Sequence, residues 1–201
     1  MAYARESVPD LTGRTAVVTG ANGGLALLMP ALLAAPAARV VTVTSTARHL
    51  GRRVDADDPH MHRGYGPWRA YARSELANYH FGLGLQREFD RAGVDAMSLL
   101  AHPGLSRSNL QVHTVEQDGG GRSARFWAWL ARTTGMEVED GAVPQIRAAT
   151  DPRARGGQLY GPRFANTGRA VRLPVLRPGA GAAIRTLWTV CERETGIAVR
   201  I

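Results

Sequence analysis

A tyrosine and a glutamate one helical turn apart, Tyr71 and Glu75, are the residues of this chain with the clearest capacity for chemistry. A tyrosine followed four residues later by lysine on a helix makes a catalytic acid, because the ammonium group lowers the phenol pKa towards neutrality. Here the fourth residue is a glutamate, and a neighbouring carboxylate raises a phenol pKa instead. All 25 basic residues are arginines, so no lysine elsewhere can substitute. The sequence therefore predicts an enzyme scaffold whose central acid lacks its activator.

A glycine-rich turn lies near the beginning of the chain, in TGANGGL at 19–25. It follows a short apolar run at 15–19, which indicates a buried strand, and precedes a helical stretch at 25–38 that Pro30 interrupts. Glycines in this context let a dinucleotide pyrophosphate approach the backbone at a helix N-terminus. Such a turn alone is a weak signal, and Ala26 stands where a third glycine would help close helix packing.

The rest of the chain alternates between strand and helix patterns. We expect strands at 39–45, 94–101 and 157–161, and helices at 68–91, 125–134, 138–150 and 182–195. The segments between Ser45 and Trp68 and from Pro162 to Gly181 are typical of loops. This alternation predicts an α/β fold with a mostly parallel sheet of about four strands and flanking helices. At 201 residues, the chain is expected to form one domain.

The order of these motifs resembles the short-chain dehydrogenase/reductase superfamily, and above all its retinol-dehydrogenase-like or WW-domain-oxidoreductase-like branch. The match is carried by TGANGGL at 19–25, VVTVTSTARH at 40–49, WRAYARSELAN at 68–78 and AHPGLSRSNL at 101–110, and it extends through RGGQLYGPRF at 155–164 to LWTVCERETG at 187–196. The resemblance implies a Rossmann-like, doubly wound sheet. It also implies NAD- or NADP-dependent hydride transfer between a small-molecule alcohol and a carbonyl.

Individual roles follow from the same resemblance. Ser45 matches the serine that hydrogen-bonds the substrate, Tyr71 matches the acid/base, and Glu75 replaces the family's lysine. Contacts with the cofactor are implied for the residues that match the phosphate-binding turn and the turn beside the nicotinamide, namely Gly20, Asn22, Gly24, Leu25, Pro103, Gly104 and Ser108.

The replacement at Glu75 predicts weak or absent activity. The family's lysine lowers the tyrosine pKa and hydrogen-bonds the nicotinamide ribose. A carboxylate can accept a hydrogen bond from a ribose hydroxyl, but it supplies no positive field, and losing one such catalytic contact commonly costs about 10²–10³-fold in rate. A phenol near its free pKa of about 10 releases its proton only in alkali, so residual alcohol oxidation should favour high pH.

A second departure is an apparent internal deletion after Leu25. The segment ALLMPALLAA at 26–35 matches the helix just before the serine strand, and not the helix after the glycine turn. Three strand–helix units, on the order of 90 residues, would then be missing. Residues 1–25 would be the first strand and turn, and 26–201 the C-terminal half of a truncated fold with an uncovered sheet edge. The choice between NAD and NADP stays open, because the discriminating residue would lie in the missing part.

Composition argues against several partners. The net charge of +8 permits binding to polyanions, but the arginines are dispersed with one adjacent pair, Arg52-Arg53, so nucleic-acid binding is not expected. No apolar run reaches the ~20 residues that span a bilayer, and the start of the chain lacks a signal-peptide core. A single cysteine, Cys191, cannot form an internal disulfide, which favours the cytoplasm.

No metal site is expected. His60 and His62, with His49 nearby, lack a cysteine or carboxylate at ligand spacing, so they are typical of a solvated loop.

Three functions stay open from the sequence. The first is an impaired dehydrogenase. The second is a non-catalytic remnant that binds a ligand or forms a homodimer, for which the helix containing Tyr71 and Arg91 is a candidate. The third is a polyanion binder driven by the net charge of +8.

Overall fold

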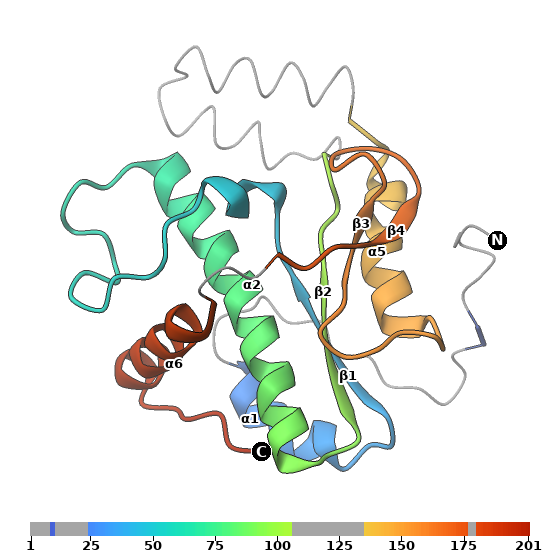
Figure 1. Ribbon diagram of the computed structural model, residues 1–201, viewed down its shortest axis with the longest axis horizontal. Helices are drawn as coiled ribbons and strands as arrows, with labels where there is room; N and C mark the ends of the chain where they lie inside the picture. Colours follow the sequence, from blue (N-terminus) through green and yellow to red (C-terminus); the bar gives the residue numbers. More distant parts are fainter. Residues whose placement is uncertain (1–8, 11–23, 106–134, 177–179) are drawn as a thin grey trace.

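The computed structural model of the chain describes residues 9–10, 24–105, 135–176 and 180–201 (Figure 1). A four-stranded sheet runs through this part in the order β1-β2-β3-β4. Strands β1 (Ala38–Val43), β2 (Ala96–Ala101) and β3 (Leu159–Pro162) are parallel neighbours, whereas β4 (Ala170–Leu173) is antiparallel to β3. The prediction of a mostly parallel α/β sheet with flanking helices is confirmed.

Strand β4 corrects the expected loop at 162–181. A tight turn joins it to β3, in which the Arg163 N–H donates to the Arg169 carbonyl at 3.0 Å and the Phe164 N–H to the Thr167 carbonyl at 3.0 Å. The strand has only four residues and one fully buried side chain, Ala170, so it leaves little hydrophobic pattern in the sequence. The strand predicted at 15–19 and the helix predicted at 125–134 lie outside the described residues.

The helices begin and end where local chemistry allows. Helix α2 (Pro67–Ala92) has its proline at the start, where no intrahelical hydrogen bond is lost, and ends at Gly93 with a left-handed φ of 64°. Helices α5 (Val138–Thr150) and α6 (Ala180–Thr195) match their predicted ranges within two residues. Helix α1 (Gly24–Leu33) is shorter than expected and contains Pro30 without ending there.

The sheet is covered on both faces, with α2 and α6 on one side and α5 on the other (Figure 1). Successive residues of β2 alternate between these faces. Leu100 packs with Leu83 of α2 and Ile184 of α6, whereas Leu99 packs with Ala148 of α5. Both leucines are fully buried, so β2 lies at the centre of the core.

This packing places the predicted site residues at one edge of the sheet. Ser45 follows the end of β1, and the His102–Gly104 turn follows the end of β2, because parallel strands end on the same side. In α/β folds, the carboxyl edge of the sheet is where ligands bind. None of the helices in the described ranges is both long and apolar enough to cross a membrane.

Candidate active site

The structure brings Ser45 and Tyr71 together. Ser45 caps η2 (Thr46–Leu50), a short 3-10 helix after β1, and its hydroxyl accepts a hydrogen bond from the Ala47 N–H at 3.2 Å. Tyr71 lies in the second turn of α2, and its phenol lies near enough to the Ser45 side chain for Ser45 to lower its pKa. Burial raises the pKa of Tyr71, the neighbouring Ser45 side chain opposes this, and the Glu75 charge raises it further, so the phenol stays protonated beyond its ordinary range.

Three residues of α2 form one face towards the end of β1 and η2: Tyr71, Glu75 and Tyr79, spaced one helical turn apart. The Thr44 hydroxyl donates to the backbone carbonyl of Glu75 at 2.7 Å, which fixes the middle of this face against the strand end. We call Tyr71, Glu75 and Tyr79 the α2 column. Glu75 therefore lies one helical turn from Tyr71, as the sequence predicts, and one turn from Tyr79 on its other side.

The Glu75 carboxylate is half-buried, and its Oε2 has no hydrogen-bond partner within the described structure. Burial raises the pKa of Glu75, and the neighbouring Asn78 and Thr44 side chains, the Ser45 backbone and the Arg48 charge oppose this. A buried carboxylate oxygen without a donor is unfavourable, so this atom has unused capacity to accept a hydrogen bond, which a ligand hydroxyl could reach only if the side chain turned outward.

Arg48 is a member of the site that sequence reasoning missed. Its residue is only 7% exposed, its Nη1 donates to the Ser45 carbonyl at 2.9 Å, and its guanidinium lies 5.3 Å from the centre of the Tyr79 ring. Burial lowers the pKa of Arg48, while the charges of Tyr79 and Glu75 favour the cation. An arginine three residues after Ser45 gave no sequence signal of burial, because arginines are mostly exposed.

The turn after β2 is held by a buried histidine. His102 is 1% exposed, and its Nδ1 accepts a hydrogen bond from the Gly104 N–H at 3.2 Å. Burial, together with the cations Arg48 and His49, lowers the pKa of His102 to about 4, so the ring stays neutral at physiological pH. Gly104 has a φ of 73°, and a Cβ there would lie 2.4 Å from the Asn166 carbonyl oxygen. The Pro103–Gly104 turn is thus fixed on both sides.

The remaining predicted cofactor residues are less well defined. Gly20, Asn22 and Ser108 lie outside the described residues, while Gly24 and Leu25 open α1. The phosphate-binding turn therefore stays a prediction. The described residues place the unpartnered Glu75 carboxylate and the fixed Gly104 turn at the same edge of the sheet, which is where the resemblance places the nicotinamide end of a dinucleotide.

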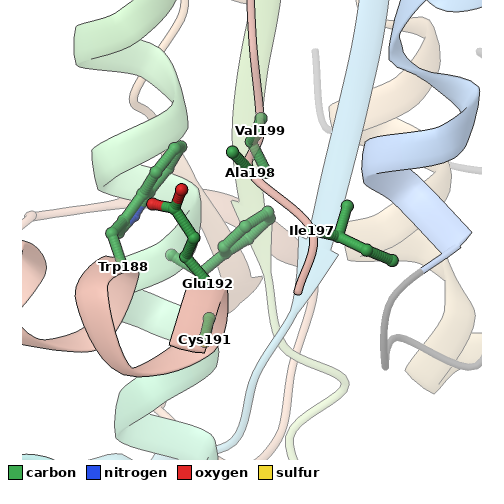
Figure 2. A pocket seen from close by; sticks show the side chains of 7 residues that line it. Trp188, Cys191, Glu192, Ile197, Ala198 and Val199 are labelled. Carbon is green, nitrogen blue, oxygen red and sulfur yellow. The ribbon is translucent and has the colours of Figure 1, made fainter. Parts of the chain in front are cut away.

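A pocket elsewhere in the fold does not contain these residues. It measures about 70 Å³ and lies between α2, α6 and the C-terminal segment, and Figure 2 shows Trp188, Cys191 and Ile197 among its lining side chains. Ligand pockets usually measure about 300–1,000 Å³, so this one is too small for a cofactor.

The histidine-containing loop is held by protein contacts. The His60 Nε2 lies 2.8 Å from a Glu194 carboxylate oxygen, and the Arg193 guanidinium donates to the Ala56 carbonyl at 2.9 Å. In the described ranges, no three histidine, cysteine, aspartate or glutamate side chains are grouped so that they could hold a metal ion.

Sequence comparisons connect the chain to dehydrogenases. It is 38% identical over 136 residues to a polyprenol dehydrogenase of Mus musculus, covering 65% of this chain and 38% of that protein. It is 30% identical over 186 residues to the short chain dehydrogenase/reductase dpfgH of Gibberella zeae, covering 81% and 49%. It is 35% identical over 88 residues to human retinol dehydrogenase 12, covering 44% and 27%.

A solved structure is also similar. A putative uncharacterized protein from Mycobacterium paratuberculosis is 33% identical and superposes with a TM-score of 0.61, covering 81% of this chain and 52% of that one. No protein-family model matches the chain. The chain spans less than half the length of the curated relatives named above.

Proposed function

Because the chain belongs to the short-chain dehydrogenase/reductase superfamily, on its retinol-dehydrogenase-like side, we propose that it carries a weakened NAD(P)-dependent alcohol/carbonyl oxidoreductase site. The observation that supports this most strongly is the proximity of the Ser45 and Tyr71 side chains at the carboxyl edge of the sheet. Supporting an enzyme role further, Ser45 is fixed by capping η2 and by the donation of Arg48 to its carbonyl.

Each of the predicted site residues has a role in this proposal. Ser45 and Tyr71 would bind the substrate oxygen, and Tyr71 would exchange the proton with it. The Pro103–Gly104 turn and the free oxygen of Glu75 would hold the nicotinamide end of NAD or NADP, which supplies hydride transfer when bound. The phosphate-binding residues Gly20, Asn22, Gly24 and Leu25, together with Ser108 beside the nicotinamide carboxamide, complete the proposed cofactor site. The substrate would be a small-molecule alcohol or carbonyl, in the cytoplasm.

The proposed weakness comes from the protonation state of Tyr71. Burial and the Glu75 charge both raise the pKa of the phenol, so its base form exists only in alkali. Alcohol oxidation needs the substrate proton to be accepted, whereas carbonyl reduction needs a proton to be donated. We therefore expect oxidation to be slow at neutral pH and to rise with pH, while reduction is less affected.

The test is a rate measurement in both directions. Purified protein would be assayed with NAD⁺ and NADP⁺ on a series of primary and secondary alcohols from pH 7 to pH 10, and with NADH and NADPH on the matching carbonyls. Tyr71→Phe should lower the rate at least about 10²-fold. Tyr65→Phe, at an exposed tyrosine outside the site, is the matched control and should keep the rate. Equal rates in parent and Tyr71→Phe would contradict the proposal.

The second candidate is a non-catalytic ligand-binding remnant, and Glu75 favours it because no lysine charge acts on Tyr71. In its dimerising form, a homodimer would pair through α2. Part of that helix is covered within the chain, since Phe81 stacks on Trp188 of α6 with ring centres 5.7 Å apart. Binding of a ligand, with no measurable oxidation or reduction at any pH tested, would favour this candidate over the enzyme.

A further inference from the structure

Three contacts join the α2 column to the segment from Thr44 to Arg48. The Tyr71 phenol lies near the Ser45 side chain, the Glu75 carbonyl accepts from the Thr44 hydroxyl at 2.7 Å, and the Tyr79 ring lies under the Arg48 guanidinium at 5.3 Å. The column and the segment are therefore in register over about two turns of helix. This register brings the Arg48 cation within electrostatic reach of the Glu75 carboxylate, between η2 and α2.

The surroundings of Arg48 hold one carboxylate. The charged or titratable groups that act on it are Glu75 and Tyr79 from α2, His49 from η2 and His102 from the end of β2. Only Glu75 among these carries a negative charge at neutral pH. Within the described residues, Arg48 makes no ion pair at contact distance, so its charge is balanced by Glu75 through space and by the Ser45 carbonyl directly.

We propose that Arg48 is the positioning residue of this site: its buried guanidinium is the countercharge of Glu75 and holds the Ser45 backbone in place for the Ser45–Tyr71 contact. This rests on the proposed function. The superfamily's cation at position 75 is thus exchanged for an anion, with a cation standing at position 48. Removing one partner of a buried charge pair is costly, because the other is left uncompensated.

One consequence is that Glu75→Lys alone does not restore the ordinary site. It would leave the new ammonium group and Arg48 as two buried cations with no carboxylate between them. The pair must be changed together, and Arg48→Met with Glu75→Lys is the matching replacement, because methionine keeps the length of the arginine stem without its charge.

The test is the stability of paired variants, measured by urea unfolding at pH 7.5 without any cofactor. Glu75→Lys should lower the folding equilibrium constant by about 100-fold or more, and adding Arg48→Met should recover at least about tenfold. Arg147→Met is the matched control, because Arg147 also lies 5.3 Å from a tyrosine ring but is paired with Asp151. Added to Glu75→Lys, it should lower stability further.

A second comparison, of Arg48→Met in the parent and in Glu75→Gln, tests the proposal even where Glu75→Lys does not fold. Arg48→Met should lower the folding constant at least about fivefold more in the parent than in Glu75→Gln, where no negative charge needs balancing. Equal losses in the two backgrounds would overturn the countercharge.

The positioning role has a separate readout, the alkaline titration of Tyr71 followed by phenolate absorbance and identified by its loss in Tyr71→Phe. Arg48→Met should move this titration to higher pH, because Glu75 loses its countercharge and Ser45 its anchor, and Arg48→Lys should largely restore it. An unchanged titration in Arg48→Met would overturn the positioning role. Neither the unfolding measurement nor the Tyr71 titration needs a cofactor or turnover. If the rate assay finds no activity, both measurements therefore still test the role of Arg48.

Discussion

The buried neutral histidine at the end of β2 gives a quantitative prediction for stability. His102 has a pKa of about 4 in the folded protein, and an unfolded histidine has a pKa of about 6.5. Below pH 6.5 the unfolded chain therefore binds a proton that the folded protein does not. The contribution of His102 to stability is fully present above pH 6.5 and is lost as the pH falls towards 4.

The size of this loss follows from the two pKa values. The free energy of unfolding should fall by about 1.4 kcal/mol between neutral pH and pH 5.5, and by about 2.6 kcal/mol by pH 4.5, with a limit of about 3.4 kcal/mol. The same protonation would remove the Nδ1 acceptor of the Gly104 N–H, so the turn after β2 should loosen near pH 4.

The assay is urea unfolding of the parent and of His102→Gln at several pH values between 7.5 and 4.5. Other titrating groups act equally on both proteins, so the difference between the two curves isolates His102. His102→Gln should be less stable at pH 7.5, and the gap should narrow by about 2–3 kcal/mol by pH 4.5. A gap that stays constant with pH would refute the neutral, buried state of His102.

Three further outcomes are expected. Gly82→Ala should lower the free energy of unfolding by about 1–3 kcal/mol and so lower the thermal midpoint, because a Cβ there would lie 2.6 Å from a side-chain atom of the underlying sheet. An unchanged midpoint would contradict this close approach. Despite burial, hydrogen bonds from neighbouring arginines, Arg147 among them, hold the pKa of Asp151 below its ordinary value. Asp151→Asn should therefore lower the free energy of unfolding by about 2 kcal/mol at pH 7, and this difference between parent and variant should shrink as the pH falls through the lowered pKa. A difference that does not change with pH in urea unfolding would be evidence against the Arg147–Asp151 ion pair. Glu75→Gln removes a charge that raises the pKa of the Tyr71 phenol, so the phenol should dissociate at lower pH in an absorbance titration; no shift would show that this charge does not reach the phenol.

The sequence predicted the elements that carry strong local signals. Strands β1, β2 and β3 have compact apolar runs, and α2 has a proline at its start, helical periodicity and a glycine after its end. Strand β4 was missed because it is a short edge strand, and its formation depends on pairing with β3 and not on its own residues.

The candidate site could be predicted only where its residues match a motif. The spacing of Tyr71 and Glu75, and the place of Ser45 at a strand end, gave these residues directly. The burial of Arg48 could not be predicted, because it results from η2 packing against α2, a tertiary contact that no local pattern encodes. The low pKa of His102 has the same origin, since it depends on burial and on Arg48.

The central claim is that the carboxyl edge of this sheet still holds the nicotinamide end of a dinucleotide. The most direct measurement is equilibrium titration of the purified chain with NADH and NADPH, followed by nicotinamide fluorescence, with Glu75→Leu alongside. We predict saturable binding of at least one cofactor in the micromolar range, weakened about tenfold or more in Glu75→Leu, because a hydrogen bond to a charged acceptor is lost. No binding of either cofactor up to millimolar concentrations would contradict the claim.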